Sequence, residues 1–341
     1  MKPRPTIRDL AAHLGISHTT VSLALRHDPR IPPATRARVQ KAARALGYRA
    51  DAVVSSLMAR LRTLRTKPVQ AALGFITAWP TRHGWRQASI LQRFHLGAPR
   101  RARALGYTLD EFWLTEPGMT GDRMSRILCA RGIRGLILHS LPAAGGTLKL
   151  DWKHFACVTK GLTVVQPHAH RVVSSHYEDM QLVLHRLAAR RYRRIGLVLS
   201  ETLSVRVDRA WLAAFLLQQN ETPASDRLPA LITRTDDEEA HFIEWFSAFR
   251  PEVILFSDQP IPTWVQRLKL NVPADVGLVH LDWSRDVAPL AGLDSDPETI
   301  GMAATDLLVG QLQANEFGTP KHEKIVAVRG RWVPGGSVRR R

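Results

Sequence analysis

The chain has 341 residues, of which 45% are hydrophobic and 23% charged, and its formal net charge is +18. This composition excludes a disordered chain, and the length exceeds that of one typical domain. No apolar run approaches the ~20 residues that a membrane-spanning helix needs, which argues against a membrane protein.

The N-terminal residues and the cysteine content both indicate in which compartment the protein works. The first ten residues, MKPRPTIRDL, lack the apolar segment of a secretory signal peptide. Two cysteines, Cys129 and Cys157, cannot form a disulfide framework, and their apolar surroundings predict buried free thiols. We therefore expect a reducing bacterial cytoplasm, where the protein can reach the nucleoid.

Residues 6–25, TIRDLAAHLGISHTTVSLAL, are typical of a helix, a turn and a second helix. Thr6 can cap the first helix, and Asp9 three positions later can complete a capping box. Apolar side chains then recur with helical spacing at Ile7, Leu10, Ala11 and Leu14. Gly15 can end this helix because glycine tolerates positive φ, and Ser17 can cap the next helix.

The second helix has two different faces. Val21, Ala24 and Leu25 are predicted to face inward. The opposite face carries short, polar or basic side chains, namely His18, Thr19, Ser22, Leu23 and Arg26. This pattern is typical of a DNA-binding helix-turn-helix, whose second helix lies in the major groove. The alternative is an ordinary helical hairpin with a solvated outer face.

The charge distribution favours the DNA-binding interpretation. Residues 1–67 contain 14 Lys and Arg against 3 Asp and Glu, a net +11 out of the +18 of the whole chain. Positive charge is therefore concentrated where phosphates would be contacted. A third helix, predicted from Pro33 to Leu46, completes a small three-helix core.

This N-terminal run resembles the DNA-binding domain of LacI/GalR-family transcriptional regulators. The resemblance rests on the Thr-Ile start, the Gly-x-Ser turn, Thr20-Val21-Ser22, Thr35-Arg36 and Ala45-Leu46-Gly47-Tyr48. It implies that His18, Thr19 and Leu23 read base edges. The full set of DNA-binding residues that it implies is Thr6, Ser17, His18, Thr19, Thr20, Ser22, Leu23, Arg26, Arg49 and Leu57. Many family members have Arg where this chain has Leu23, which implies an altered operator because Leu can only pack, for instance on a thymine methyl.

Residues 50–68 lie where the family has a hinge helix. Asp51 can cap a short helix, and Leu57 matches the leucine that wedges into the minor groove. The adjacent Val53 and Val54 lower the helix propensity, so we hypothesise that this helix forms only when two hinges meet on DNA. The alternative is a basic linker without insertion.

From residue 71, strands and helices are predicted to alternate. Strand-length apolar runs occur at 72–78, 135–139, 155–158, 195–199, 253–256 and 276–281. Helical spacing occurs at 90–105, 180–189, 209–219, 240–249 and 300–313. This rhythm predicts parallel sheets covered on both faces, and the length favours two doubly wound lobes.

The same part of the chain resembles the effector-binding body of the family, which is similar to periplasmic sugar-binding proteins. The matching landmarks include Ala104-Leu105-Gly106-Tyr107, Arg193-Arg194-Ile195-Gly196, Val272-Pro273 with Asp275-Val276, Asp282 and Ile300-Gly301. The expected fold is multidomain: a small all-α helix-turn-helix domain followed by a two-lobed α/β periplasmic-binding-protein-like body. The expected boundaries are 1–49 for the DNA-binding domain, 50–68 for the hinge and 69–341 for the effector-binding and dimerisation domain. Within the last, we expect an N-lobe of about 71–168 and 297–316 and a C-lobe of about 172–284 and 323–336.

Ligands bind such sheets beyond the carboxyl ends of the strands. The residues expected there are Trp79, His139, Ser140, Ser200, Arg206, Arg209, Asp258, Asp282 and Trp283, with Lys160 and Glu201 also following strands. Asp and Arg suit hydroxyl groups, and an indole suits the C–H face of a sugar ring. Either Arg206 or Arg209 matches the family arginine. Where many members have Asp-Asn, this chain has Ser175-His176, so nucleosides and other small molecules remain alternatives to a sugar.

We therefore expect a homodimeric transcriptional repressor that binds a palindromic operator and responds to a small-molecule effector, with no catalytic residue, metal or cofactor. Histidines near Cys157 lack the spacing of a zinc motif. A solute-binding protein would need a signal peptide and no basic helical domain. A nucleoid protein binding by charge alone is the other alternative. The sequence leaves open repressor against activator, dimer against tetramer, and inducer against corepressor.

Overall fold

A computed structural model describes residues 5–25, 31–46, 48, 71–234 and 237–340. The chain divides into two compact units, Met1–Val69 and Gln70–Arg341. We describe each unit by itself and call them the helical unit and the body.

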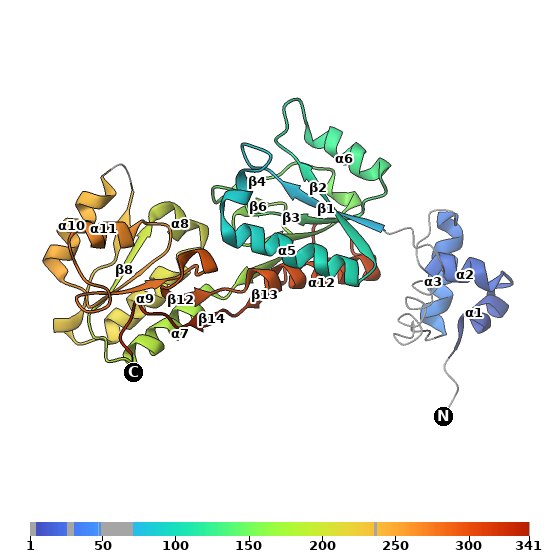
Figure 1. Cartoon of the computed structure of the whole chain (residues 1–341). Helices are drawn as coiled ribbons and strands as arrows, with labels where there is room; N and C mark the ends of the chain where they lie inside the picture. Colours follow the sequence, from blue (N-terminus) through green and yellow to red (C-terminus); the bar gives the residue numbers. More distant parts are fainter. Residues whose placement is uncertain (1–4, 26–30, 47, 49–70, 235–236, 341) are drawn as a thin grey trace. The chain divides into compact units, whose positions relative to one another are not determined.

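The helical unit has three described helices, α1 (Ile7–Leu14), α2 (His18–Leu25) and α3 (Pro33–Ala45) (Figure 1). The predicted capping box is present: the Thr6 amide donates to Asp9 Oδ2 at 2.7 Å, and the Asp9 amide donates to Thr6 Oγ1 at 3.3 Å. Gly15 follows α1 with φ of 64°, the left-handed conformation that glycine adopts without strain. The core is small and consists of Leu10, Ala11, Val21, Ala24, Ile31, Val39, Ala42 and Ala43.

The body contains two six-stranded sheets, one in each lobe. The N-lobe sheet has the order β13-β7-β5-β3-β1-β2 and is parallel throughout. Its strands are β1 (Ala71–Thr77), β2 (Tyr107–Trp113), β3 (Gly135–Leu138), β5 (Ala156–Lys160), β7 (His170–Ser174) and β13 (Ile325–Val328). A separate small sheet pairs β4 (Gly146–Thr147) with β6 (Val164–Gln166).

The N-lobe sheet is covered on both faces, as its alternating side chains require. Phe75 and Ile137 face α5 (Ser89–Ala104) and α12 (Pro297–Ala314), while Ile76 and Leu136 face α6 (Gly121–Ala130). In Figure 1, α5 and α12 run side by side. Gly97 and Gly301 make this close approach possible, because a Cβ at either position would collide with the backbone of the other helix.

The C-lobe sheet has the order β14-β12-β11-β10-β8-β9, in which only β14 is antiparallel to its neighbour. Its strands are β8 (Ile195–Ser200), β9 (Leu231–Thr233), β10 (Val253–Phe256), β11 (Gly277–His280), β12 (Ala291–Asp294) and β14 (Arg331–Val333). One face packs against α7 (His176–Ala188) and α9 (Ala210–Glu221), and the other against α10 (Glu238–Phe249) and α11 (Ile261–Arg267). A short helix, α8 (Glu201–Arg206), follows β8.

The predicted fold class is confirmed, but the lobe boundaries lie elsewhere than expected. Residues 170–174 and 325–328 form β7 and β13, which pair with each other in the N-lobe sheet, and 291–294 form β12 of the C-lobe sheet. The chain therefore crosses between lobes at Ser175, at 295–296 and at 329–330. The expected C-lobe segment 323–336 contains two short strands on either side of Gly330 that belong to different sheets.

Candidate nucleic-acid interface and effector cleft

The N-terminus of α2 is fixed by two hydroxyl side chains. The Thr20 amide donates to Ser17 Oγ at 3.1 Å, and the two hydroxyls lie 2.8 Å apart. Val21 and Ala24 are buried beneath the helix, as predicted. His18 and Thr19 are exposed, so their side chains are free to meet a base edge.

Other residues of the expected interface are more constrained. Ser22 and Leu23 are half-buried, and Leu23 packs partly against the core of the helical unit. Thr6 is exposed, but its hydroxyl is engaged with Asp9. Arg26, Arg49, Leu57 and the predicted hinge at 50–68 lie outside the described residues.

In the N-lobe, the ends of three neighbouring strands are tied together. The Trp79 indole Nε1, just after β1, donates to the Ser140 carbonyl at 2.8 Å. The Ser140 hydroxyl, just after β3, donates to the Lys160 carbonyl at the end of β5, at 3.0 Å. Trp79 and Lys160 remain half-buried, whereas Ser140 is buried. The strand ends therefore form one connected polar edge.

His139 is a correction to the expected site. Its side chain is fully buried and its ring packs edge-on against Phe75, with centroids 5.2 Å apart, and close to Trp85. Burial, with a smaller contribution from the positive charge of Lys160, lowers the pKa of His139 to about 3. Because consecutive residues alternate between faces, His139 points under α5 rather than into the cleft.

In the C-lobe, Asp282 follows β11 and faces the same polar edge. Its Oδ2 accepts a hydrogen bond from the Ser257 hydroxyl at 3.0 Å, whereas its buried Oδ1 has no partner among the described residues. Burial raises the pKa of Asp282, and the charges of His280 and Lys160 oppose that rise. The carboxylate therefore has an unused acceptor in a partly dehydrated setting.

Asp258 and Trp283 are held by their own lobe. Asp258 is exposed and accepts hydrogen bonds from the amide and the hydroxyl of Ser200. The Trp283 indole is half-buried, and its Nε1 donates to the Leu290 carbonyl at 2.9 Å. Both residues lie at the strand ends, but their polar atoms are already in use.

The choice between the two arginines is decided by their surroundings. Arg206, at the end of α8, donates from Nη1 to the carbonyls of Leu141, at 2.7 Å, and Pro142 across the two lobes. Burial lowers the pKa of Arg206, and the charges of Asp282 and Asp258 oppose this. Arg209 is exposed, has a φ of 54° and precedes α9. The contact of Arg206 therefore joins the lobes, and Arg206 is the better candidate of the two for the effector cleft.

Three residues missed as site candidates complete this region. His176 begins α7, and its ring meets the Trp211 indole edge-on at 5.0 Å between centroids. His176 Nδ1 and Trp211 Nε1 are buried, and neither has a partner in the described part of the chain. On α7, one turn further, the buried Asp179 leaves Oδ2 unpaired as well. Only the departure at Ser175-His176 signalled this region in the sequence.

The positive charge of Lys160 acts on the pKa values of both His176 and Asp282. Burial and the neighbouring Arg206 lower the pKa of Lys160 to about 8, and Asp282 counteracts them. Burial, together with Lys160, lowers the pKa of His176 to about 3, so its imidazole is neutral at pH 7. The region thus offers one ammonium group, neutral donors and carboxylate acceptors, a combination that suits a polar small molecule.

Two negative findings concern the described ranges only. Within them, no group of three or more His, Cys, Asp or Glu side chains has the arrangement of a metal site. None of the helices there is both long and apolar enough to cross a membrane.

Two family models match the sequence. The model of bacterial regulatory proteins of the lacI family matches residues 6–51, and that of the periplasmic binding protein-like domain matches residues 184–338. The chain belongs to the lacI family. As a member of this family it is a DNA-binding transcription regulator, and its body contains a periplasmic binding protein-like domain. No curated protein sequence matches the chain significantly.

Solved structures share the fold of this lacI-family chain. A complex of the transcriptional regulator CelR with cellobiose has 17% identity and a TM-score of 0.60, covering 98% of this chain and 100% of that one. A Lac repressor dimer bound to operator and the anti-inducer ONPF has 17% identity and a TM-score of 0.54, covering 98% and 99%. A putative LacI-family regulator from Rhizobium etli has 17% identity and a TM-score of 0.61, covering 78% and 98%.

Proposed function

We propose that the chain is a repressor that binds a palindromic operator as a homodimer and changes its DNA affinity when a sugar-like effector enters the cleft between the lobes. The observation that carries this proposal is the pairing of two features in one lacI-family chain. The exposed His18 and Thr19 on a firmly capped α2 can read bases. The unpaired polar atoms of Asp282, His176 and Trp211 can receive a polyhydroxylated ligand.

The cleft chemistry supports a ligand with both donor and acceptor groups. Asp282 Oδ1 accepts, Trp211 Nε1 donates, and the half-buried Lys160 ammonium donates from the facing lobe. Hydroxyl groups satisfy all three because each can donate and accept. Of the residues expected from the sequence, we propose that Trp79, Ser140, Ser200, Arg206, Asp258 and Trp283 support this position, whereas Arg209 and His139 take no part.

The test begins with selection of bound sequences from random duplex DNA at near-physiological salt. A palindromic motif bound about 10³-fold or more above random DNA is expected, and it also shows which base Leu23 tolerates. Flat enrichment with an affinity that follows salt alone would instead indicate a charge-only DNA binder.

The effector is tested on the selected operator. The protein is titrated with a panel of monosaccharides, disaccharides including cellobiose, and nucleosides. We expect one class to change operator affinity by about 5–150-fold, the usual range of allosteric coupling. If only nucleosides act, the sugar part of the proposal is wrong.

A further inference from the structure

The polypeptide crosses between the lobes three times. Polar contacts connect the third crossing to the first crossing on one side and to the second crossing on the other. The third crossing comprises Arg329 and Gly330, between β13 and β14. Arg329 donates to Glu178 on α7 through two hydrogen bonds, of 2.6 and 2.9 Å. The Gly330 amide donates to Asp179 Oδ1 at 2.8 Å. The third crossing is thereby bound to the start of α7, immediately after the first crossing.

On its other side, the third crossing is bound to the second. Arg331, the first residue of β14, donates from Nη2 to Asp294 Oδ2 at 2.9 Å. Asp294 is the last residue of β12, directly before the second crossing, and is only 1% exposed. The amide of Asp296, within that crossing, donates to Asp294 Oδ1 at 3.0 Å. Asp294 therefore joins two crossings to each other.

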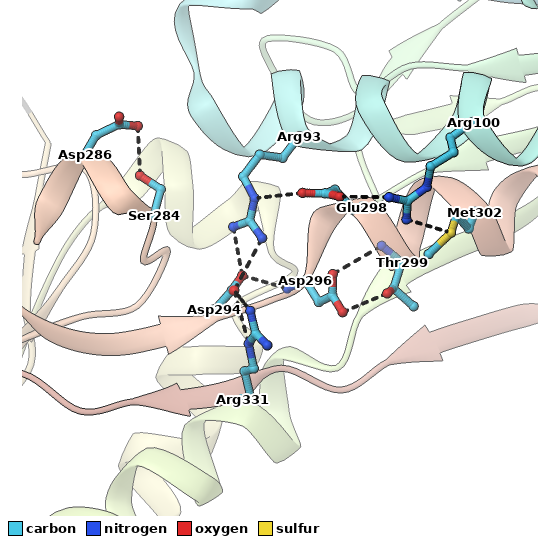
Figure 2. A network of polar contacts seen from close by, with 10 residues as sticks. All are labelled: Arg93, Arg100, Ser284, Asp286, Asp294, Asp296, Glu298, Thr299, Met302 and Arg331. Atoms are coloured by element: carbon cyan, nitrogen blue, oxygen red, sulfur yellow. Dashed lines mark hydrogen bonds and ion pairs between the residues drawn. The ribbon is translucent and has the colours of Figure 1, made fainter.

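The same carboxylate is also held from the N-lobe. Arg93 on α5 donates from Nη1 to Asp294 Oδ1 at 2.8 Å and from Nη2 to Oδ2 at 3.3 Å. Figure 2 shows Asp294 between the side chains of Arg93 and Arg331, beside the start of α12. Because Gly97 and Gly301 seat α5 firmly on α12, Arg93 extends from a rigid support.

Asp294 stays charged in this position. Burial alone would raise its pKa, but the hydrogen bonds from Arg93, Arg331 and the Asp296 amide hold the pKa below its ordinary value. Removing the carboxylate would leave the two guanidinium groups facing each other, with Glu298, 3.8 Å from Arg93 Nε, as the remaining counter-charge of Arg93. The two arginines, one from each lobe, therefore share the Asp294 anion.

We propose that Asp294, held by Arg93 and Arg331, is an interlobe latch that fixes the present arrangement of the two lobes and sets the resistance against which they move. The latch rests on the proposed function in one respect, since lobe movement is the step by which an effector would change DNA affinity. Weakening the latch makes the lobes move more readily before any effector is bound.

The test uses the full chain without ligand. One spin label is placed on the exposed Cys129 of α6 in the N-lobe, and another on α10 of the C-lobe through Ser247→Cys, a substitution at an exposed residue. Cys157 is buried and does not interfere. Pulsed electron resonance then gives the distribution of distances between the lobes. Asp294→Asn should broaden or shift this distribution.

A matched control separates the latch from a general loss of charge. Asp306→Asn breaks the ion pair that Arg101 of α5 makes with Asp306 of α12 at 2.6 Å. Both partners of this pair belong to the N-lobe, so the distribution should stay that of the parent protein. An unchanged distribution in Asp294→Asn, or an equal change in Asp306→Asn, would overturn the latch.

Hydrogen exchange gives a second readout. Loss of the charge-assisted bonds should speed exchange of the Asp296 amide roughly 10- to 100-fold. If Asp294→Asn does not fold, Arg93→Gln decides, because it removes the bond from the N-lobe while Asp294 keeps its partner Arg331. Parent-like exchange and distances in Arg93→Gln count against the latch.

The latch and the proposed function can fail separately. The distance and exchange measurements need neither operator nor effector. A chain that selects no operator but opens in Asp294→Asn keeps the latch and loses the proposed function. A chain that selects an operator but shows parent-like distances in Asp294→Asn keeps the proposed function and loses the latch.

Discussion

In the helical unit, the polar side chains available to a ligand, His18 and Thr19, are exposed. In the body, one polar atom each of Asp282, His176 and Trp211 is buried and has no partner among the described residues. The first arrangement suits a large, rigid partner such as a DNA duplex, which displaces water from the exposed side chains when it binds. The second suits a small molecule that must be enclosed to be recognised. Each unit thus suits one size of ligand, and substitutions in the two units should have separable effects.

The largest effect is expected from the small core of the helical unit. Leu10 is fully buried there, and Leu10→Ala should cost about 2–5 kcal/mol of the free energy of unfolding. With only eight buried hydrophobic residues described in that core, the unit should unfold and lose DNA binding while the body stays folded. Calorimetry and a DNA titration measure the two effects. Leu128→Ala, equally buried in the body, should keep DNA binding.

The next effect concerns the buried carboxylate of the cleft. Asp282→Asn removes a charged acceptor and should weaken binding of the active panel compound by roughly 10- to 100-fold, while operator affinity without effector is unchanged. Asp286→Asn is the control, because Asp286 pairs only with the nearby Ser284 hydroxyl among the described residues and should bind the compound normally. Equal affinities of Asp282→Asn and the parent would place the effector elsewhere.

A pH-dependent effect is expected at Asp179. Burial raises its pKa to about 6, with Glu178 and Asp282 adding to the rise and the Gly330 amide opposing it. The folded state therefore holds this proton more tightly than the unfolded state does. Parent stability should fall relative to Asp179→Asn as pH rises from about 4 through 6, by on the order of 1–2 kcal/mol after solvent screening.

Denaturant unfolding at several pH values measures this difference, and Glu178→Gln gives a comparison of opposite sign. Hydrogen bonds from Arg329 and Ser175 lower the pKa of Glu178, so its contribution is present at neutral pH and is lost on acidification. A constant difference in the free energy of unfolding between Asp179→Asn and the parent across this pH range would show that ionisation of Asp179 does not destabilise the folded state.

The smallest effect is expected at the start of α2. Ser17→Ala removes the cap on the Thr20 amide and should cost about 1 kcal/mol of stability. Ser17→Asp keeps a capping oxygen and should restore the stability but weaken DNA binding, because it adds a negative charge near phosphates. Thermal unfolding and DNA titration separate the two roles; parent-like stability of Ser17→Ala would exclude the cap.

Local features were predictable from the sequence, and tertiary ones were not. The capping box of Thr6 and Asp9 and the left-handed Gly15 depend on neighbours within four residues, and the buried face of α2 at Val21 followed from helical spacing. The fold class followed from the alternation of strands and helices. Sheet membership of β7 and β13 depends on pairing between segments far apart in sequence, so the lobe boundaries were misplaced.

The candidate site shows the same division. Asp282 could be named as a candidate because it follows a clear strand, but the face on which His139 lies was missed because a single residue decides it. Trp211 and Asp179 were missed because their unpaired atoms become visible only when α7 and α9 lie next to each other. Arg206 and Arg209 could not be separated from the sequence, because the bond that Arg206 makes to the Leu141 carbonyl joins segments far apart along the chain.

The order in which the strands join their sheets has a consequence for synthesis of the protein. The N-lobe needs α12 to cover one face of its sheet and β13 to complete its edge, and both are translated after strand β12 of the C-lobe. The helical unit can fold as soon as it leaves the ribosome, but the N-lobe must wait with Phe75 and Phe94 incompletely covered until nearly the whole chain is made. A truncated product would therefore retain a folded helical unit attached to an aggregation-prone remnant, and the body is expected to depend most on chaperones during translation.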